Sequence, residues 1–257
     1  MTPTAEKVEI ADGGHEVARG PVVARAQWGW RGRPSSVTLK LVMAGTGIVF
    51  ALFVLVHMIG NLKVYLGAEH FDEYAHWLRT LFEPLLPYEG TLWIFRVVLL
   101  SCLIAHVGSA VLLTGRAHRA RGRFRRKGLG LRSFTARTML VSGLVLLLFI
   151  IFHILDLTVG ARPFASDEFE DATRTTSYAY DNLIASFERP AVGAFYLLAM
   201  AVLGAHLIHG LWTAVNDLGI TGQRLRQVCV AIGGVLALAV MVGNMTIPIA
   251  VWTGVVS

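Results

Sequence analysis

Charged residues are scarce in this chain, at 16% of 257 residues, whereas 54% of the residues are hydrophobic. Soluble globular domains contain about 25% charged residues, so the composition argues against an ordinary soluble protein. The mean hydropathy of +0.58 points the same way. Residues 1–37 also lack the apolar core of a secretory signal, so we expect the first hydrophobic segment to be retained as a membrane anchor.

Cysteine is almost absent. The two cysteines, Cys102 and Cys229, both fall in hydrophobic segments, so a disulfide framework is not expected. The net charge of +6 would suit nucleic acid, but the basic residues alternate with membrane-length apolar runs, which argues against such a partner.

Five apolar runs approach or exceed the roughly 20 residues that cross a bilayer. The sequence therefore predicts an all-α fold, an integral membrane bundle of five transmembrane helices. Residues 1–37 are expected to form an N-terminal arm and residues 38–257 the transmembrane domain. The predicted spans are residues 38–66, 91–115, 134–160, 190–216 and 226–253, and the acidic segments 67–90 and 161–189 are predicted to be loops.

Basic and acidic connections alternate along the chain. The positive-inside rule then places the N-terminus in the cytoplasm and the C-terminus outside. The most basic connection, RAHRARGRFRRKGLGLR at residues 116–132, is typical of a cytoplasmic loop that contacts lipid and could also dock a soluble partner.

Four of the predicted spans carry a histidine in their far third, and an imidazole in hydrocarbon is costly unless something binds it. Converting position to depth at about 1.5 Å per residue places two of them near the outer face and two near the inner face. Two histidines at one depth on facing helices can supply both axial ligands of a b-type haem. The outer pair is His57 and His153, and the inner pair is His106 and His206.

Four segments carry a resemblance to a known family: HMIGNLKVYLG, FRVVLLSCLIAH, RTMLVSGLVLLLFIIFHILDLT and HLIHGLWTAVNDLGI. Over roughly residues 38–253 the chain resembles the cytochrome b membrane-anchor subunit of succinate dehydrogenase (complex II), of the five-helix, single-subunit, two-haem type. The resemblance implies an outer haem on His57 and His153 and an inner haem on His106 and His206, with His209 as the substitute for His206, a propionate contact or a packing residue. It also makes Arg96 and Arg137 candidates for pairing with haem propionates, although the positive-inside rule explains Arg137 nearly as well.

The resemblance further implies a multi-pass subunit of the bacterial plasma membrane that anchors a flavoprotein subunit and an iron–sulfur subunit. It would pass their electrons to a quinone, menaquinone or ubiquinone, at the protein–lipid edge, and the complex could form a higher oligomer. The chain has no flavin-binding, nucleotide-binding or dicarboxylate-site motif, so it should not oxidise succinate alone.

Three polar residues near the outer histidines are candidates for quinone contact: Asn61, Lys63 and Asp156. Each has a structural alternative, since Asn61 could cap its helix, Lys63 could extend to the interface, and Asp156 could orient His153 or pair with Lys63. In addition, some two-haem fumarate reductases of this type have a glutamate for transmembrane proton movement where this chain has Gly204, which mildly favours succinate oxidation.

Three rival interpretations remain open. A Rieske-type [2Fe-2S] cluster could use Cys102, His106, His206 and Cys229, in place of the inner haem or beside it. The chain could also be the cytochrome b subunit of a hydrogenase or a formate dehydrogenase. A transporter with histidines along its pathway is the alternative from another class.

Overall fold

The computed structural model describes residues 34–121 and 131–257, and only the backbone of residues 121 and 131–137. Most of the predicted N-terminal arm, the centre of the basic connection and the side chain of Arg137 therefore lie outside the described residues.

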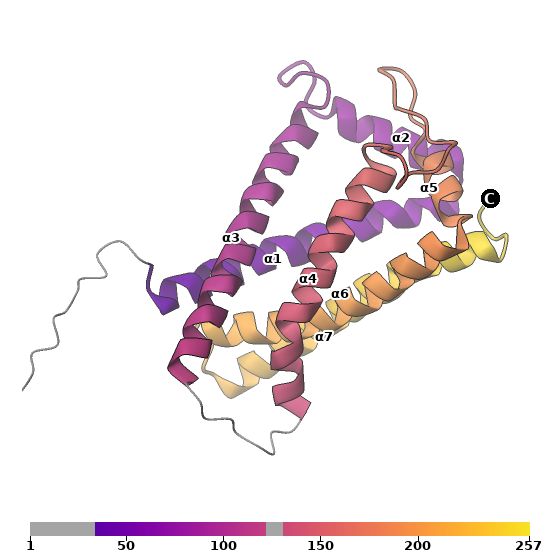
Figure 1. The fold of residues 1–257 in the computed structure, drawn as a ribbon. Helices are drawn as coiled ribbons and strands as arrows, with labels where there is room; N and C mark the ends of the chain where they lie inside the picture. The colour runs from indigo at the N-terminus through magenta and orange to yellow at the C-terminus, as the bar shows by residue number, and fades with distance from the viewer. Residues whose placement is uncertain (1–33, 122–130) are drawn as a thin grey trace, which may run out of the picture. The chain divides into compact units, whose positions relative to one another are not determined.

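All regular structure in the described ranges is helical (Figure 1). The elements in chain order are α1 (Ser36–Asn61), the 3₁₀ turn η1 (Leu62–Leu66), α2 (Ala68–Thr80), α3 (Gly90–Arg121), α4 (Leu131–Leu157), α5 (Ala179–Phe187), α6 (Pro190–Asp217) and α7 (Gln223–Trp252). Five of them (α1 with η1, α3, α4, α6 and α7) contain segments long and apolar enough to cross a membrane. The predicted all-α fold with five spans is confirmed.

The acidic segments after the first and third spans were predicted as loops, but each contains a short helix. Gly67 lies between η1 and α2 with φ of 93°, a conformation that favours glycine. Phe71 of α2 packs on Tyr180 of α5 with ring centroids 6.2 Å apart, and Asp72 accepts a hydrogen bond from the Tyr180 backbone at 3.1 Å. These two helices are therefore held by contacts with each other and with the ends of the spans.

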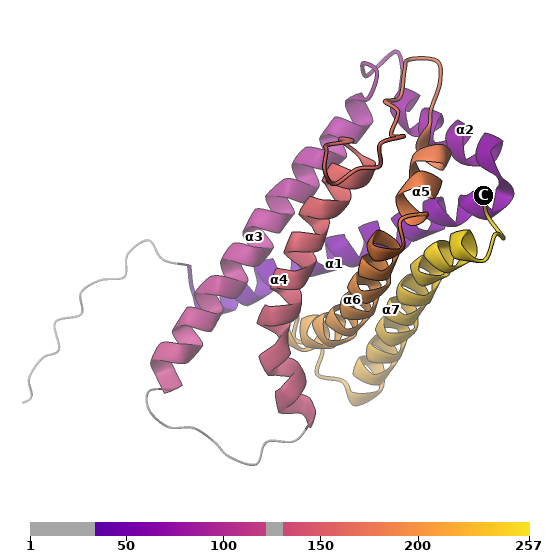
Figure 2. The same ribbon diagram turned by 45° about the vertical axis from the view of Figure 1, so that its right-hand side comes forward.

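Only some of the spans pack closely against one another in the described part of the chain. α6 lies along α7, α1 packs against α3, α6 and α7, and α4 packs against α6 (Figures 1 and 2). By contrast, α1 and α4 are not closely packed in the described part of the chain, and neither are α3 and α6. Each predicted histidine pair is carried by one of these two separated helix pairs.

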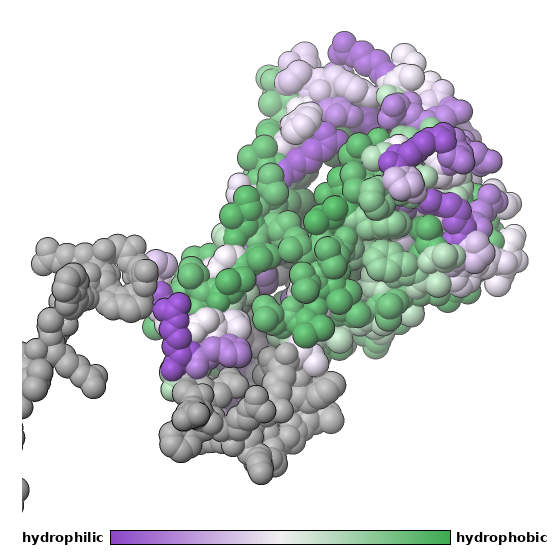
Figure 3. Space-filling view, viewed as in Figure 1, coloured by the Kyte–Doolittle hydropathy of each residue, from purple (hydrophilic) through white to green (hydrophobic). Residues whose placement is uncertain are grey.

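The outer surface of the spans is apolar. Large side chains such as Val97, Val141, Leu198 and Val235 are exposed, as lipid-facing residues should be. Figure 3 shows hydrophobic side chains over the middle of the molecule, with hydrophilic ones gathered around α2, α5 and the neighbouring loops.

Glycines bring α6 and α7 close together. A Cβ at Gly204 would lie 2.6 Å from the sulfur of Met241 on α7. Gly204 stands where some two-haem fumarate reductases have a glutamate. Met241 occupies the adjacent space here, so a side chain as large as glutamate does not fit at this position. At the other end of α6, a Cβ at Gly193 would lie 2.6 Å from the indole of Trp252.

We expect the substitution Gly193→Ala to destabilise the protein. The Trp252 ring would have to move, although its Nε1 donates a hydrogen bond to the Phe187 carbonyl at 2.9 Å. Overpacking of this kind costs about 1–3 kcal/mol, so the melting temperature of the purified protein in detergent should fall. In the control, Gly234→Ala, the new Cβ enters open space on α7 and should leave the melting temperature unchanged or slightly higher. Equal melting temperatures would contradict this account of the packing.

Candidate functional site

His57 on α1 and His153 on α4 face each other across the gap between their helices. Their ring centroids are 5.9 Å apart with the ring planes at 80°. Metal–imidazole bonds of about 2 Å, with each ring centre about 1 Å farther out, would put the two centroids about 6 Å apart. The spacing therefore fits one metal ion held between the two histidines.

Each outer histidine stacks on a phenylalanine one turn before it. Phe53 lies 5.4 Å from His57 at an interplanar angle of 11°, and Phe149 lies 5.8 Å from His153 at 28°. The phenylalanines restrict how far each imidazole can turn about its own side chain, so both rings are pre-oriented.

The inner histidine on α3, His106, is held by a threonine of α1. Thr46 Oγ1 lies 3.0 Å from His106 Nδ1, and it also donates to the backbone carbonyl of Val42 at 2.7 Å. Gly47 faces the same ring, where an added Cβ would lie 3.4 Å from His106 Cε1. The absence of a side chain at Gly47 thus gives the imidazole its space.

The inner histidine on α6, His206, has the same surroundings. Ser142 Oγ of α4 lies 2.9 Å from His206 Nδ1 and donates to the Met139 carbonyl at 3.1 Å. An added Cβ on Gly143 would lie 3.6 Å from His206 Cε1.

These hydroxyl contacts favour one tautomer of both inner histidines. A hydroxyl group has one proton to donate, and Thr46 and Ser142 each give theirs to a backbone carbonyl of their own helix. With their protons on these carbonyls, their oxygens accept from the imidazole, which favours the tautomer with the hydrogen on Nδ1. The other ring nitrogen, Nε2, is left with a free lone pair, which is the form of histidine that binds a metal.

His153 also has a hydroxyl group at Nδ1, which in this case is bonded to a carboxylate. Its Nδ1 lies 3.3 Å from the hydroxyl of Tyr196, which donates to Asp156 Oδ2 at 2.9 Å. Asp156 is 1% exposed and also accepts from Ser186 at 2.6 Å and from Arg189 at 2.5 Å. Because the Tyr196 proton is given to the carboxylate, the hydroxyl oxygen accepts from His153 Nδ1.

The two halves of the bundle repeat the same arrangement. TGIVFALFVLVH at residues 46–57 aligns with SGLVLLLFIIFH at residues 142–153, with the hydroxyl residue, the glycine, the phenylalanine and the histidine at matching positions. The second helices also correspond, because Phe95 and Phe195 stand eleven residues before His106 and His206. Our sequence analysis missed this repeat, although the hydroxyl–glycine pair ten to eleven residues before each outer histidine was a visible signal.

His209 is placed differently from the four paired histidines. Its ring is tilted against Trp212 with centroids 5.7 Å apart, and its carbonyl accepts a hydrogen bond from Thr213 at 2.8 Å. Within the described residues no hydroxyl or carboxylate bonds its ring. The contacts therefore favour His206 over His209 as the partner of His106.

Arg96 lies ten residues before His106, at the level of the outer histidines. It donates to Glu89 Oε2 at 3.3 Å, and its guanidinium lies 4.8 Å from the centre of the Trp93 ring. Glu89 also accepts from Arg79 at 3.3 Å. Arg96 is thus already paired with a carboxylate and would have to exchange it to bind a propionate.

The three candidates for quinone contact form different interactions. Asn61 donates to Asn244 on α7 at 3.1 Å, so its side chain joins two helices instead of capping one. Lys63 lies over the ring of Tyr74, 5.2 Å from its centre, and does not pair with Asp156. Asp156 orients His153 only indirectly, through Tyr196.

Tyr74 is a residue that the sequence analysis missed, because its segment was predicted as a loop. Its ring packs on Gly60, where an added Cβ would come within 2.9 Å of the phenolic oxygen. Burial raises the pKa of the Tyr74 hydroxyl, so it stays protonated and can donate a hydrogen bond. Tyr74 and Lys63 together place two proton donors beside the end of the first span.

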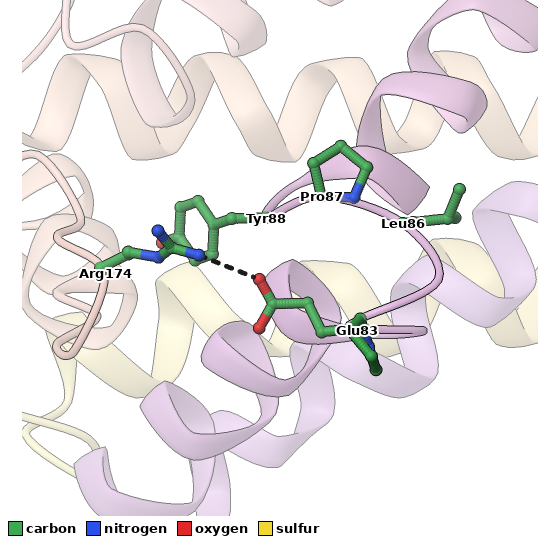
Figure 4. A pocket seen from close by; sticks show the side chains of 6 residues that line it. Glu83, Leu86, Pro87, Tyr88 and Arg174 are labelled. Carbon is green, nitrogen blue, oxygen red and sulfur yellow. Dashed lines mark hydrogen bonds and ion pairs between the residues drawn. The ribbon is translucent and has the colours of Figure 1, made fainter.

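A surface hollow of about 470 Å³ lies away from the histidines. Figure 4 shows Arg174 and Tyr88 side by side there, with Arg174 reaching Glu83. The ion pair is 3.4 Å long, and the Arg174 guanidinium lies 5.5 Å from the centre of the Tyr88 ring. The hollow contains none of the predicted cofactor or quinone residues.

The four candidate ligands of an iron–sulfur cluster do not form a common site. Within residues 34–121 and 131–257, no three histidine, cysteine or acidic side chains are grouped so that they could hold a metal ion together. Cys102 and Cys229 are both free thiols, on α3 and α7, and these two helices are not closely packed in the described ranges.

Comparison with known proteins identifies a distant relative. The chain is 25% identical over 174 residues to the succinate dehydrogenase cytochrome b558 subunit of Bacillus subtilis (strain 168), covering 68% of this chain and 75% of that protein. This chain is a distant relative of the succinate dehydrogenase cytochrome b subunits. No family model and no solved structure matches it.

The five spans and the relationship to this distant relative together make the protein a multi-pass protein of the bacterial membrane. This distant relative supports the resemblance recognised in the sequence. The matched depths also correctly indicated that His57 and His153 would lie together.

We expect Arg189→Met to destabilise this protein strongly. Arg189 is the charge partner of Asp156, whose side chain is 0% exposed, and removal of one partner of a buried pair costs about 3–5 kcal/mol. Thermal denaturation in detergent measures the loss. The control, Arg162→Met, breaks an ion pair with Asp167 in which the side chains are 65% and 84% exposed, and it should change stability by less than about 1 kcal/mol. Equal effects of both substitutions would show that Asp156 does not depend on the charge of Arg189.

Proposed function

We propose that this chain is the membrane-anchor and electron-transfer subunit of a succinate:quinone oxidoreductase that carries two b-type haems. The observation that carries the proposal is the spacing of His57 and His153, whose ring centroids lie 5.9 Å apart. The hydroxyl contacts at Nδ1 of His106, His153 and His206 support it. The distant relationship to a succinate dehydrogenase cytochrome b subunit supports it.

The residues present fit bis-histidine ligation. His57 and His153 would hold one haem and His106 and His206 the other. Cofactor sites in helix bundles are built in this way, from side chains on facing helices that project into the bundle core. Gly47, which faces His106, lies ten residues from His57 on the same helix. The two sites are therefore offset by about 15 Å along the helix axis.

When bound, a haem at each site would supply one-electron oxidation and reduction. The chain's own residues orient the ligands, leave space for them and exclude water. Thr46, Ser142 and Tyr196 keep the Nδ1 hydrogen in place, so that Nε2 of their histidines is available as a ligand. The glycines opposite the inner histidines leave room for the rings, and the apolar spans keep water away.

The quinone would bind at the outer end of the bundle, on the side of Lys63 and Tyr74. Reduction of a quinone consumes protons, and general acid catalysis needs donors within hydrogen-bonding distance of its carbonyl oxygens. The Lys63 ammonium and the protonated Tyr74 hydroxyl meet this need near the lipid boundary. Asp156 is fully buried and bonded to three donors, so we assign it to His153 and not to the quinone.

The soluble partners would bind at the opposite end of the bundle. That end contains the start of α1 and the end of α6, which are joined by Lys40 and Asp217 at 3.1 Å. Arg116 near the end of α3 donates to Ser36 at 2.9 Å and to the Pro34 carbonyl at 2.7 Å. Under the positive-inside rule this end faces the cytoplasm, where a flavoprotein subunit and an iron–sulfur subunit would dock.

Substitution of single histidines tests the haem assignment. The wild-type protein should contain two haems per polypeptide, measured from the dithionite-reduced minus oxidised spectrum and the protein concentration. His57→Ala and His153→Ala should each lose one haem, and His106→Ala and His206→Ala should lose the other. His209→Ala is the control on the same helix and should keep both. A colourless wild-type protein would exclude the haem proposal and favour a transporter.

Purification of the intact complex tests the assigned reaction. An affinity tag on this chain should recover a flavoprotein and an iron–sulfur protein from the source membrane, and succinate should reduce the haem of that complex. The isolated chain should be reduced by dithionite but not by succinate, because it has no site for the dicarboxylate. Reduction by hydrogen or formate in place of succinate would assign the chain to the other class of respiratory dehydrogenase.

A further inference from the structure

We propose that Asp156, Ser186 and Arg189 act through Tyr196 on His153 and set the redox potential of one of the two haem sites. The inference rests on the proposed function, in that it takes His57 and His153 as the ligands of the outer haem. It makes Tyr196 and Asp156 positioning residues that tune one ligand, in addition to any part they play in folding.

The connection is continuous and built from three elements. Asp156 and His153 lie one turn apart on α4, Ser186 is on α5, and Tyr196 is on α6. The Tyr196 hydroxyl lies between the two α4 residues, 2.9 Å from Asp156 Oδ2 and 3.3 Å from His153 Nδ1. Tyr196 is 5% exposed, so water does not compete for these bonds.

The negative charge of Asp156 decides which group donates in each hydrogen bond of this connection. Arg189 lies 2.5 Å from Asp156 Oδ1 and stabilises the ionised carboxylate, which can only accept hydrogen bonds. Tyr196 must therefore donate to Asp156 and accept from His153. Hydrogen bonds to an ionised acceptor are roughly twice as strong as neutral ones, so the carboxylate polarises the phenol and, through it, the imidazole.

Polarisation of this kind makes the ligand nitrogen more basic. A carboxylate behind a ligating histidine raises its basicity, and a more electron-rich ligand stabilises the ferric over the ferrous state. The expected effect of the Asp156–Tyr196 connection is a lower midpoint potential at the site that contains His153.

The other histidines lack such a connection. His106 and His206 bond to the hydroxyls of Thr46 and Ser142, which donate to neutral backbone carbonyls. His57 stacks on Phe53, and in the described part of the chain its ring forms no hydrogen bond. The position equivalent to Tyr196 in the first half of the chain is Arg96, which pairs with Glu89. The effect should therefore be confined to one haem.

The deciding variant is Tyr196→Phe, which removes only the hydroxyl and leaves Asp156 paired with Arg189. Spectroelectrochemical titration of the purified complex should show two haems, with the midpoint potential of one raised and the other unchanged. We expect about a tenfold change in the ferrous-to-ferric ratio of the affected haem at a fixed potential, which is about 59 mV for a one-electron couple. The low-spin ferric EPR signal of the same haem should shift.

Tyr180→Phe is the matched control. It also removes a part-buried phenol, whose hydroxyl donates to the Ser257 carbonyl at 3.2 Å and touches no histidine. Neither midpoint potential should move in this variant. If both substitutions raise the same potential equally, the effect is a general consequence of loosened packing and the proposal is overturned.

Ser186→Ala provides a test that does not alter Tyr196. It removes one of the two hydroxyls that donate to Asp156 Oδ2, so the carboxylate should draw more strongly on Tyr196 and lower the same midpoint potential. This variant decides the question if Tyr196→Phe does not assemble.

The outcomes separate this inference from the proposed function. Two haems with unmoved potentials in Tyr196→Phe would overturn the tuning role and leave the haem assignment intact. Loss of one haem in Tyr196→Phe, with both kept in Tyr180→Phe, would support the role of Tyr196 in positioning His153. A wild-type protein without haem would overturn both proposals.

Discussion

An imidazole inside a membrane needs a partner for each of its two nitrogens, and this requirement organises the bundle. Unsatisfied polar groups in hydrocarbon cost several kcal/mol. The chain meets the requirement at His106, His153 and His206 by placing a hydroxyl from a neighbouring helix against Nδ1. Each of these hydroxyls in turn has an acceptor for its own proton. Nε2 of each of these rings is thereby available to bind a ligand.

This requirement also explains which helices touch. α1 contacts α3 because Thr46 and Gly47 receive His106, and α4 contacts α6 because Ser142 and Gly143 receive His206. α1 and α4 are not closely packed, and the rings of His57 and His153 meet between them. The close packing that stabilises the bundle is instead provided by α6 and α7, where glycines let the helices approach.

Much of this arrangement could be predicted from the sequence, because it depends on local regularities. The number of apolar runs long enough to cross a membrane predicts the number of membrane helices. The rise per residue places His57 and His153 at matched depth, and these two residues do lie together. The environment of Asp156 could not be predicted, because its partners Arg189 and Tyr196 are 33 and 40 residues away. Nor could the helices in the two acidic segments, which are short and are stabilised by contacts such as Phe71 on Tyr180.

The repeat raises the question of why its two halves are not identical. They agree at the hydroxyl, glycine, phenylalanine and histidine positions, which are the ones that hold and orient the rings. They differ at 96 and 196, where one half has an arginine bound to an acidic residue of the adjoining loop and the other has a tyrosine bound to a buried acid. A bundle that only had to hold two identical groups would gain nothing from this difference. A bundle that moves electrons in one direction does gain from it, because unequal ligand environments give its two sites unequal potentials. Under the proposed function, the asymmetry therefore lies where it can affect electron transfer without disturbing the framework that both halves share.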